Sequence, residues 1–447
     1  MSGYKNLKIF SYEHPGDKDA LEKEKNKRLA DYGTIKFPLL INPIDESTRS
    51  EGLGIMSSDT LELFLVPIPD YNSLLNKIRD NSSEIKSLMD QLPAIVRKKF
   101  FMKMLVSEVE KTNEIENVET TVEEIEKAIK KADEEKADEE KANKEKAVRL
   151  KSFAYMYLSI MKEDTPRVEN LEDIRRSYDS LLKGEIAEDK LPDGELFRNG
   201  YVRIGNKTKT VLSPKTKEED IKKQLESWIE FINNDSIDSI LKACVAHYYF
   251  EYVHPFYDGN GRLGRYIFCS YIGKKVDPFT AISFSYQVNL KKRKYYDEFE
   301  EVENARNYGE ITFFVIRLLK FLVSGQNYVL KKLNLYNKTL DFIASKLEKW
   351  DISKAEASIL FIYSQAKLFQ FDDGSMDDRI LYGVLNSNII SKPELKTSQG
   401  KMRIYLKEFE EKGLIETVKR RPLKRKLTEK FFKEIGLDIK EFDLDIK

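Results

Sequence analysis

Two apolar helical segments separated by a short loop constrain the fold of this chain more than any other feature of its sequence. In the first, apolar residues recur at helical spacing over residues 237–248, and the helix is predicted to end near Val253. The same spacing marks a second helix that begins near Asn260 and continues to Tyr271. Further helical segments extend to about Leu347, so we predict a mainly helical protein.

The overall composition excludes several classes of protein. Lysine plus arginine and aspartate plus glutamate each total 76 among 447 residues, so net charge predicts neither a nucleic-acid partner nor a membrane partner. The two cysteines, Cys244 and Cys269, lie in apolar helical surroundings that favour buried thiols in a reducing compartment. The N-terminal residues contain no apolar run as long as that of a signal peptide, and no later stretch approaches the ~20 apolar residues that cross a membrane. We expect a soluble, cytoplasmic protein.

Changes in composition along the chain predict three regions. Residues 1–90 form an N-terminal extension with strand-like runs at Lys36–Ile41 and Leu61–Ile68. Residues 91–345 form the helical core, and residues 346–447 form a separate small domain. A chain of this length is expected to contain two or three domains.

Two segments stand out at the start of the helical core. A long helix should run from Pro93 to about Ile115, within residues 91–121, because its apolar residues share one face. Residues 122–150 form a charged insertion with a five-residue near-repeat at residues 131–147. The repeat has no large apolar side chain and places opposite charges three or four residues apart, which favours a solvated helix over a coiled coil.

The loop between the two apolar helices carries the residues that best suit a phosphate. Residues 254–265 read HPFYDGNGRLGR. Gly259 and Gly261 let the backbone approach a ligand closely, and the free N–H groups at the start of the second helix attract anions. Arg262 and Arg265 are three residues apart, so they share a helix face and could hold adjacent phosphates.

Two further side chains of this loop suit catalysis. Asp258 offers a hard oxygen ligand for Mg²⁺ that bridges two phosphates. His254, with an ordinary pKa of ~6.5, is mostly neutral at pH 7 and can accept a proton from an attacking hydroxyl. Each residue alone has an ordinary structural explanation, but their combination favours a catalytic site.

The loop resembles the signature of the Fic family, His-x-Phe-x-Asp/Glu-Gly-Asn-Gly-Arg-x-x-Arg, at every specified position. The resemblance implies a protein adenylyltransferase, which moves AMP from ATP to a Ser, Thr or Tyr hydroxyl of a target protein. It makes His254 the catalytic base, Phe256 a core anchor and Asp258 the Mg²⁺ ligand. It also implies an ATP-binding segment in which Arg265 takes the γ-phosphate: Gly259, Asn260, Gly261, Arg262, Leu263, Gly264 and Arg265.

The resemblance also implies a fold and two flanking elements. The fold is a helical Fic core with a β-hairpin flap, followed by a small C-terminal winged helix of α+β type. Arg198–Pro214, with a turn at Gly205-Asn206, is similar to the flap on which a target segment docks by strand addition; a surface hairpin without function is the alternative. Tyr296, after Tyr295, resembles a contact of the adenine pocket, with core packing as the alternative. His247 is predicted to be structural.

Many Fic proteins carry an inhibitory motif, Ser/Thr-x-x-x-Glu-Gly/Asn, whose Glu pairs with the second Arg of the signature. Three segments match it: Ser47–Gly52, Thr112–Asn117 and Thr165–Asn170. The second follows an apolar-faced helix, whereas turn formers surround the first and Pro166 interrupts the third. We therefore predict an inhibitory motif with these three specified positions: Thr112, Glu116 and Asn117.

The C-terminal region has two open interpretations. Ser391–Lys396 and Gln399–Lys412 could form a helix-turn-helix, with a strand at Leu414–Val418 and a basic turn at residues 419–426 as its wing. Six cations in these eight residues suit a phosphate backbone, so residues 391–426 could contact DNA. A solvated basic loop on a protein-docking domain fits the sequence equally well.

Alternatives to adenylyl transfer also stay open at this point. One is a DNA-binding regulator whose Fic core senses nucleotide without turnover. Another is a Fic enzyme that transfers a different phosphate-containing group or removes AMP. The resemblance also allows a homodimer, and it names neither the target protein nor the modified residue.

Overall fold

The computed structural model of the protein shows a mainly helical chain with small sheets, which confirms the predicted fold class. Its strands form three separate sheets within the described residues. The structure describes residues 3–44, 60–136, 149–161, 165, 167–202, 204–205, 210–212, 214–369, 374–386 and 395–438.

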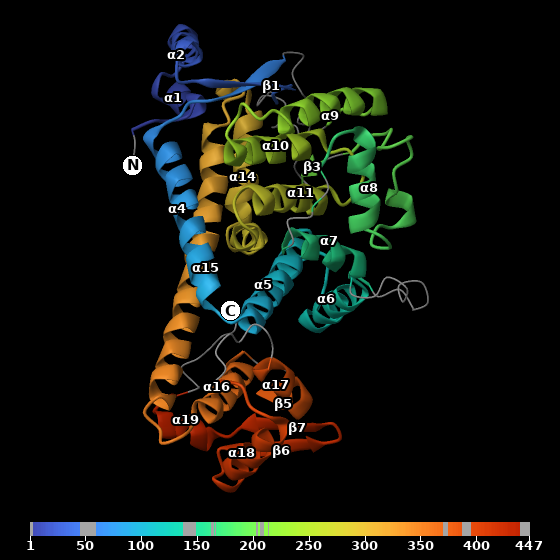
Figure 1. Cartoon of the computed structure of the whole chain (residues 1–447). Coiled ribbons are helices and arrows are strands. Elements are labelled where there is room, and N and C mark those ends of the chain that lie inside the picture. Colours follow the sequence, from blue (N-terminus) through green and yellow to red (C-terminus); the bar gives the residue numbers. More distant parts are fainter. Residues whose placement is uncertain are drawn as a thin grey trace. The chain divides into compact units, whose positions relative to one another are not determined.

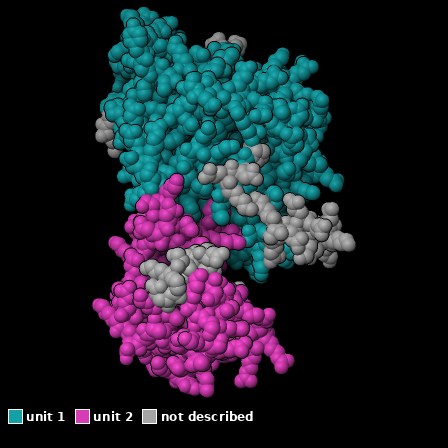
Figure 2. Space-filling model, in the orientation of Figure 1, with its two compact units in different colours: residues 1–85, 104–329 teal, residues 86–103, 330–447 magenta. Residues whose placement is uncertain are grey.

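Packing divides the chain into two compact units (Figure 2). The first comprises residues 1–85 and 104–329, and the second comprises residues 86–103 and 330–447. Each unit thus combines two separate stretches, whereas the sequence predicted continuous regions. Three long helices contribute residues to both units: α4 (Pro69–Gln91), α5 (Ala94–Ile115) and α15 (Thr312–Leu347).

A two-stranded antiparallel sheet, β1 (Ile35–Ile41) and β2 (Leu61–Leu65), lies in the first unit and confirms the two predicted strand-like runs. Two tyrosines of helix α10 (Ser239–Val253) hold β1 in place. The Tyr249 hydroxyl donates to the Leu40 carbonyl at 3.0 Å, and the N–H that follows β1 donates to the Tyr252 hydroxyl at 2.8 Å. The sheet therefore supports the helix that leads into the loop.

Three helices, α9 (Glu218–Ile232), α10 and α11 (Asn260–Lys275), lie side by side at the centre of the first unit (Figure 1). The bounds of α10 and α11 confirm the two apolar helices and the loop between them. Nearly every residue of α10 is buried, which explains its continuous run of apolar and aromatic residues. The Trp228 indole N–H donates to the Ala246 carbonyl at 2.8 Å and joins α9 to α10.

The remaining elements of the first unit surround these helices. Helix α6 contains the start of the charged insertion, as predicted, while residues 137–148 lie outside the described chain. The other helices are α1 (Leu7–Glu13), α2 (Lys18–Ala30), α6 (Val122–Lys136), α7 (Lys151–Met161), α8 (Leu171–Leu181), α12 (Pro278–Ala281), α13 (Phe284–Leu290) and α14 (Lys292–Glu303), with short 3₁₀ turns at Glu188–Lys190 and Ala305–Asn307.

Helix α15 ends at Leu347, where the helical segments were predicted to end. By length and composition, α15 could cross a membrane, so it comes closer to a spanning helix than the sequence suggested. However, 61% of its most apolar 18-residue window is buried inside the protein, as in a core helix.

The second unit contains a three-stranded sheet of order β5-β7-β6. The antiparallel pair β6 and β7 confirms the predicted strand and turn, and α18 confirms the second helix of the predicted helix-turn-helix. The first predicted helix, Ser391–Lys396, lies mostly outside the described residues. The elements are α16 (Lys354–Leu368), β5 (Ser375–Asp377), α17 (Asp378–Leu385), α18 (Gln399–Glu411), β6 (Ile415–Arg420), β7 (Leu423–Leu427) and α19 (Glu429–Ile435).

Candidate active site

The loop between α10 and α11 is fixed by Asn260 and Phe256. The Asn260 side chain accepts a hydrogen bond from the Phe256 N–H at 2.9 Å and donates one to the Phe256 carbonyl at 2.8 Å. The Phe256 ring is fully buried and stacks on Tyr178 of α8 with 3.7 Å between ring centroids. Both ends of the Asn260 amide are therefore used to shape the loop, and α11 can begin immediately after it.

Helix α11 opens on a glycine that no other residue could replace without strain. Gly259 has φ of 87°, and a Cβ added there would lie 2.3 Å from Leu182. The Leu263 N–H donates to the Gly259 carbonyl at 3.0 Å, so the N–H groups of the three residues before Leu263 have no acceptor within the helix. These N–H groups form an anion-binding end.

His254 ends α10 in a left-handed backbone conformation, with φ of 51°. Its Nδ1 lies 3.2 Å from the Glu251 carbonyl, and because a carbonyl only accepts, Nδ1 carries the proton. The Nε2 atom is then left unprotonated and able to accept a proton. Burial, assisted by the charge of Arg198, lowers the pKa of His254 to about 4, so the imidazole is neutral at pH 7.

Arg198 holds the His254 backbone, a role that the sequence analysis missed. Its fully buried guanidinium donates to the carbonyls of His254 at 2.7 Å, Gly200 at 2.8 Å and Lys215 at 2.7 Å. It thereby joins the end of α10 to both ends of the flap segment. The partners lie up to 56 residues away, and nothing in the local sequence marks Arg198 apart from its place at the start of the flap.

Arg262 is a buried cation that still has donors to offer. Its side chain is 1% exposed, and its Nε and Nη1 atoms have no hydrogen-bond partner among the described residues. The nearest carboxylate is that of Asp258, whose Oδ1 lies 3.7 Å from Nη2 and whose side chain is half exposed. A buried guanidinium with unused donors beside a helix N-terminus suits an oxyanion such as phosphate.

Arg265, the second arginine, is occupied by α5 and the turn that follows it. Its Nε donates to the Thr112 hydroxyl at 2.8 Å, and its Nη2 donates to the Glu116 carboxylate at 2.7 Å. Burial favours the neutral form of Glu116, but the adjacent Arg265 outweighs it and holds the pKa of Glu116 below its usual range. The pair is therefore ionised at neutral pH.

The Glu116 carboxylate also covers the first turn of α11. A Cβ added at Gly261 would lie 2.1 Å from Glu116 Oε1, so only glycine leaves room for it. Asn117 follows with φ of 58°, a left-handed conformation that Gly and Asn adopt most readily and that ends α5. This conformation gives a physical reason for Gly or Asn at the last position of the motif.

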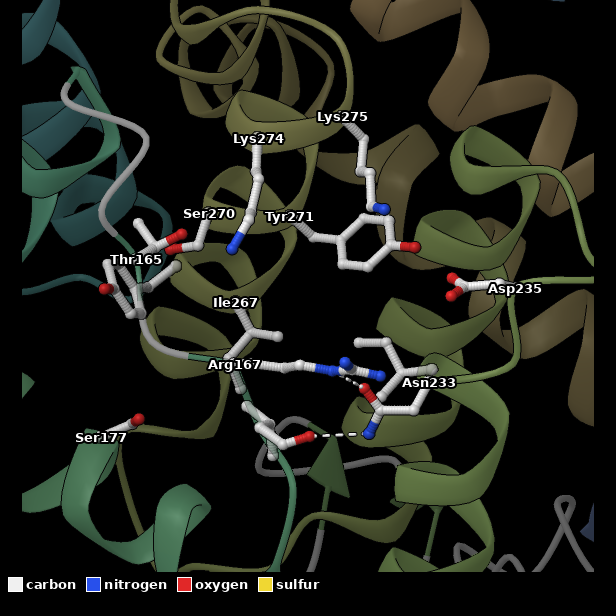
Figure 3. A pocket seen from close by; sticks show the side chains of 13 residues that line it. Thr165, Arg167, Ser177, Asn233, Asp235, Ile267, Ser270, Tyr271, Lys274 and Lys275 are labelled. Carbon is white, nitrogen blue, oxygen red and sulfur yellow. Dashed lines mark hydrogen bonds between the residues drawn. The ribbon is translucent and has the colours of Figure 1, made fainter.

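The other two motif matches do not supply a partner for Arg265 in the described structure. Ser47–Gly52 lies outside the described residues. In the third match, Thr165 lines a separate hollow of about 170 Å³ beside the C-terminal half of α11, where Arg167 is hydrogen-bonded to Asn233 (Figure 3). Glu169 lies 3.9 Å from Arg167, and Asn170 caps α8.

Two of the positions predicted to bind ATP direct their side chains toward the protein core. The Leu263 side chain is fully buried, and its N–H is used within α11. At Gly264, an added Cβ would lie 2.1 Å from the buried Glu251 carboxylate. A helix turns by about 100° per residue, so these two positions point away from the face that carries the arginines. A contact between ATP and Leu263 or Gly264 would therefore have to come from the backbone, and their predicted place in the nucleotide site stays a prediction.

The two tyrosines near the site differ in burial. Tyr295 is buried, and its hydroxyl lies 2.7 Å from Nε2 of His247, which is also buried. This contact suits the structural role predicted for His247. The neighbouring Tyr296 is 40% exposed, and burial together with the charge of Glu116 raises its pKa. Tyr296 is thus the tyrosine that remains available beside the Glu116 carboxylate.

Glu108 is a second residue that the sequence analysis missed. It is fully buried on α5, where its Oε2 accepts from the Ser285 N–H at 2.8 Å and its Oε1 accepts from the Ser285 hydroxyl at 2.5 Å. Glu108, Thr112 and Glu116 are spaced by four residues, so one side of this segment makes all three polar contacts. Ser285 is 177 residues away, and no local pattern could have revealed the contact.

Two short strands pair where the hairpin was predicted, although Gly205, predicted in the turn, lies in the first strand and pairs with Thr210. Strands β3 (Ile204–Gly205) and β4 (Thr210–Leu212) are antiparallel, and the residues between them lie outside the described chain.

Among the described residues, no three His, Cys, Asp or Glu side chains gather as a metal site. Asp258 is the carboxylate that the loop itself offers to a cation bound with phosphates.

Comparisons with known proteins agree with this geometry. Residues 169–272 match the Fic/DOC family. Over 50 residues, which are 10% of this chain and 10% of the relative, the sequence is 44% identical to the protein adenylyltransferase fic-1 of Caenorhabditis elegans.

Solved structures of Fic proteins are also similar to this chain. A Fic family protein from Desulfovibrio desulfuricans has a TM-score of 0.49 and 17% identity, covering 81% of this chain and 96% of that one. A Fic-1 fragment from Caenorhabditis elegans has a TM-score of 0.38 and 18% identity, covering 58% of this chain and 72% of that one. The segment that matches the Fic/DOC family, residues 169–272, contains the whole loop between α10 and α11.

Proposed function

We propose that this protein transfers AMP from ATP to a hydroxyl group of a target protein and that Glu116 inhibits the transfer. The observation that carries the proposal is the combination of a neutral imidazole, a helix N-terminus and the unused donors of Arg262 in one loop. The Fic/DOC match and the short similarity to a protein adenylyltransferase support the same chemistry.

In this proposal, His254 Nε2 accepts the proton of the attacking hydroxyl. The hydroxyl oxygen forms a bond to the α-phosphorus of ATP, the bond between the α-phosphorus and the bridging oxygen breaks, and pyrophosphate leaves with its electron pair. The N–H groups that open α11 and the Arg262 guanidinium bind phosphate oxygens. Asp258 would hold Mg²⁺, which supplies charge neutralisation to the phosphates when bound. Tyr296 would contact the adenine.

The inhibition proposed for Glu116 is a competition for one cation. The Arg265 guanidinium would bind the γ-phosphate, but the Glu116 carboxylate already occupies it at 2.7 Å. Because Glu116 is part of the same chain, its effective concentration at Arg265 is high, and the inhibited arrangement is favoured. ATP could still bind through the other groups with its γ-phosphate displaced.

Labelled ATP distinguishes this function from its rivals. The protein, and a Glu116→Gly variant, would be incubated with ATP carrying label at either the α- or the γ-phosphate. Retention of α label alone supports AMP transfer, whereas retention of γ label alone identifies phosphorylation. No retained label with either protein favours a nucleotide sensor. Release of AMP from a prelabelled protein would identify the reverse reaction.

Target docking is proposed for the flap, residues 198–214. Among the described residues, β3 and β4 form a sheet of two strands, so the outer edge of either strand could be joined by an extended target segment through backbone hydrogen bonds. Arg198 connects this hairpin to His254, so a docked hydroxyl would lie near the base.

Replacing Arg198 with methionine should reduce transfer by at least about tenfold, through kcat, with little change in ATP affinity. The change keeps the side-chain length but leaves several backbone carbonyls without their donor, which should also lower stability by about 2 kcal/mol or more. Steady-state kinetics, ATP titration and chemical denaturation would measure these effects. Arg198→Lys should restore part of kcat, and an ATP affinity that falls in step with kcat would contradict a positioning role.

Replacing Glu108 with glutamine should raise transfer severalfold by loosening α5. Glutamine retains one acceptor for Ser285 but loses the other, which weakens an anchor two turns from Glu116. Ser285→Ala should act in the same direction, and Glu110→Gln, a change on a more exposed position of α5, should have no effect. In the Glu116→Gly background, Glu108→Gln should add nothing; an additional increase there would exclude this mechanism.

A further inference from the structure

The second unit contains a basic groove of its own. It has a volume of about 860 Å³ and lies between the first turns of α17 and α18 and the turn that joins β6 to β7. We propose that this groove binds the phosphate backbone of double-stranded DNA. Its lining includes Arg379, Arg403, Arg420 and Arg421.

The charge of this groove is not neutralised by its own acidic residues. Arg403, Arg420 and Arg421 are exposed, and no described carboxylate lies within ion-pair distance of any of them. The two aspartates that line the groove make contacts with other groups. Asp377 caps α17 and lies 3.9 Å from Arg379, and Asp378 pairs with Arg425. The donors of Arg403, Arg420 and Arg421 are therefore available for an external polyanion.

The arrangement of the cations favours a duplex. Arg403 lies on α18, and Arg420 and Arg421 lie at the tip of an antiparallel hairpin, so one helix and one β-ribbon present charge to the same groove. The major groove of B-form DNA is about 12 Å wide and admits a helix, with phosphates on both sides for flanking cations. The deep, narrow major groove of duplex RNA does not admit a helix.

A residue that could contact base edges also lines the groove. Gln399 is exposed at the first position of α18, after the cap residue Ser398. Glutamine can form paired hydrogen bonds with adenine, and the beginning of a recognition helix is where such contacts are made. The arginines explain affinity for phosphate, and Gln399 would be the position that reads sequence.

The test measures binding of the full chain to a fluorescent DNA duplex of about 20 base pairs by anisotropy at several salt concentrations. We expect binding that weakens steeply as salt rises. Arg420→Gln with Arg421→Gln should weaken binding at least tenfold and reduce the slope of log affinity against log salt by about two. Arg403→Gln should weaken binding with a smaller change in slope.

The control variant is Lys430→Gln with Lys433→Gln, which removes the same charge from α19, outside the groove. It should bind DNA as the unchanged protein does. Equal loss in the two double variants, absence of binding at low salt, or tighter binding of an acidic polypeptide or duplex RNA would overturn the proposal. Because His254→Ala should leave DNA binding unchanged, this result is independent of adenylyl transfer.

Discussion

Replacing His254 with alanine is expected to lower AMP transfer by at least about 100-fold and to leave ATP affinity nearly unchanged. General-base catalysis contributes roughly 10²- to 10⁴-fold, and alanine offers no proton acceptor. The Glu251 carbonyl fixes the proton on Nδ1, and burial keeps the ring neutral. The proton acceptor that the alanine variant lacks is therefore Nε2. The phosphate-binding groups belong to α11 and are not altered.

The experiment is clearest in the Glu116→Gly background, where inhibition cannot hide a loss of chemistry. Transfer would be measured with α-labelled ATP, ATP affinity by calorimetry and folding by thermal melting. The chain contains a matched control, because His14 is exposed and far along the sequence from the loop. His14→Ala should transfer AMP normally. A folded His254→Ala variant with substantial transfer would mean that another group, or water, accepts the proton.

The local features of this fold could be predicted because their causes are local. The helices α10 and α11 follow from apolar periodicity, and the loop between them follows from glycine and proline. The end of α5 at Ile115 places Glu116 in the turn that follows it, as the motif requires. The hairpin β6–β7 and its basic turn were likewise visible in the sequence.

The remaining parts depend on contacts between residues far apart in the chain. Nothing in the local sequence distinguishes Arg198 or Glu108 from other charged residues. Their roles depend on contacts in the folded chain, between Arg198 and His254 and between Glu108 and Ser285. Each compact unit also combines two separate stretches of the chain, which composition alone does not reveal.

The side-chain directions in α11 could also be predicted from the sequence itself. Arg262 and Arg265 share a helix face only because the two residues between them, Leu263 and Gly264, are turned away. A helical wheel of residues 260–275 therefore excludes those two residues from the arginine face. The signature defines which residues recur in the loop, whereas helix geometry decides which of them can reach a ligand.

Replacing Glu116 with glycine is expected to raise transfer by about 10- to 100-fold. A hydrogen bond between charged groups contributes about 1.5–3 kcal/mol, and each 1.4 kcal/mol corresponds to a factor of ten. Removing the carboxylate frees one N–H of Arg265 Nη2, while the other still donates to the Thr112 carbonyl at 3.0 Å. The change also uncovers the first turn of α11, because the Glu116 carboxylate lies against Gly261. Thr112 still accepts from Arg265, so the guanidinium should keep its position.

Two measurements separate relief of inhibition from general loosening. ATP should raise the melting temperature of Glu116→Gly more than that of the unchanged protein, since its γ-phosphate then replaces the missing carboxylate at Arg265. Glu169→Gly, in a rival motif whose glutamate lies beside Arg167, should change neither quantity. If Glu116→Gly and the unchanged protein transfer AMP equally, the contact between Glu116 and Arg265 only stabilises the fold, and inhibition must come from another segment.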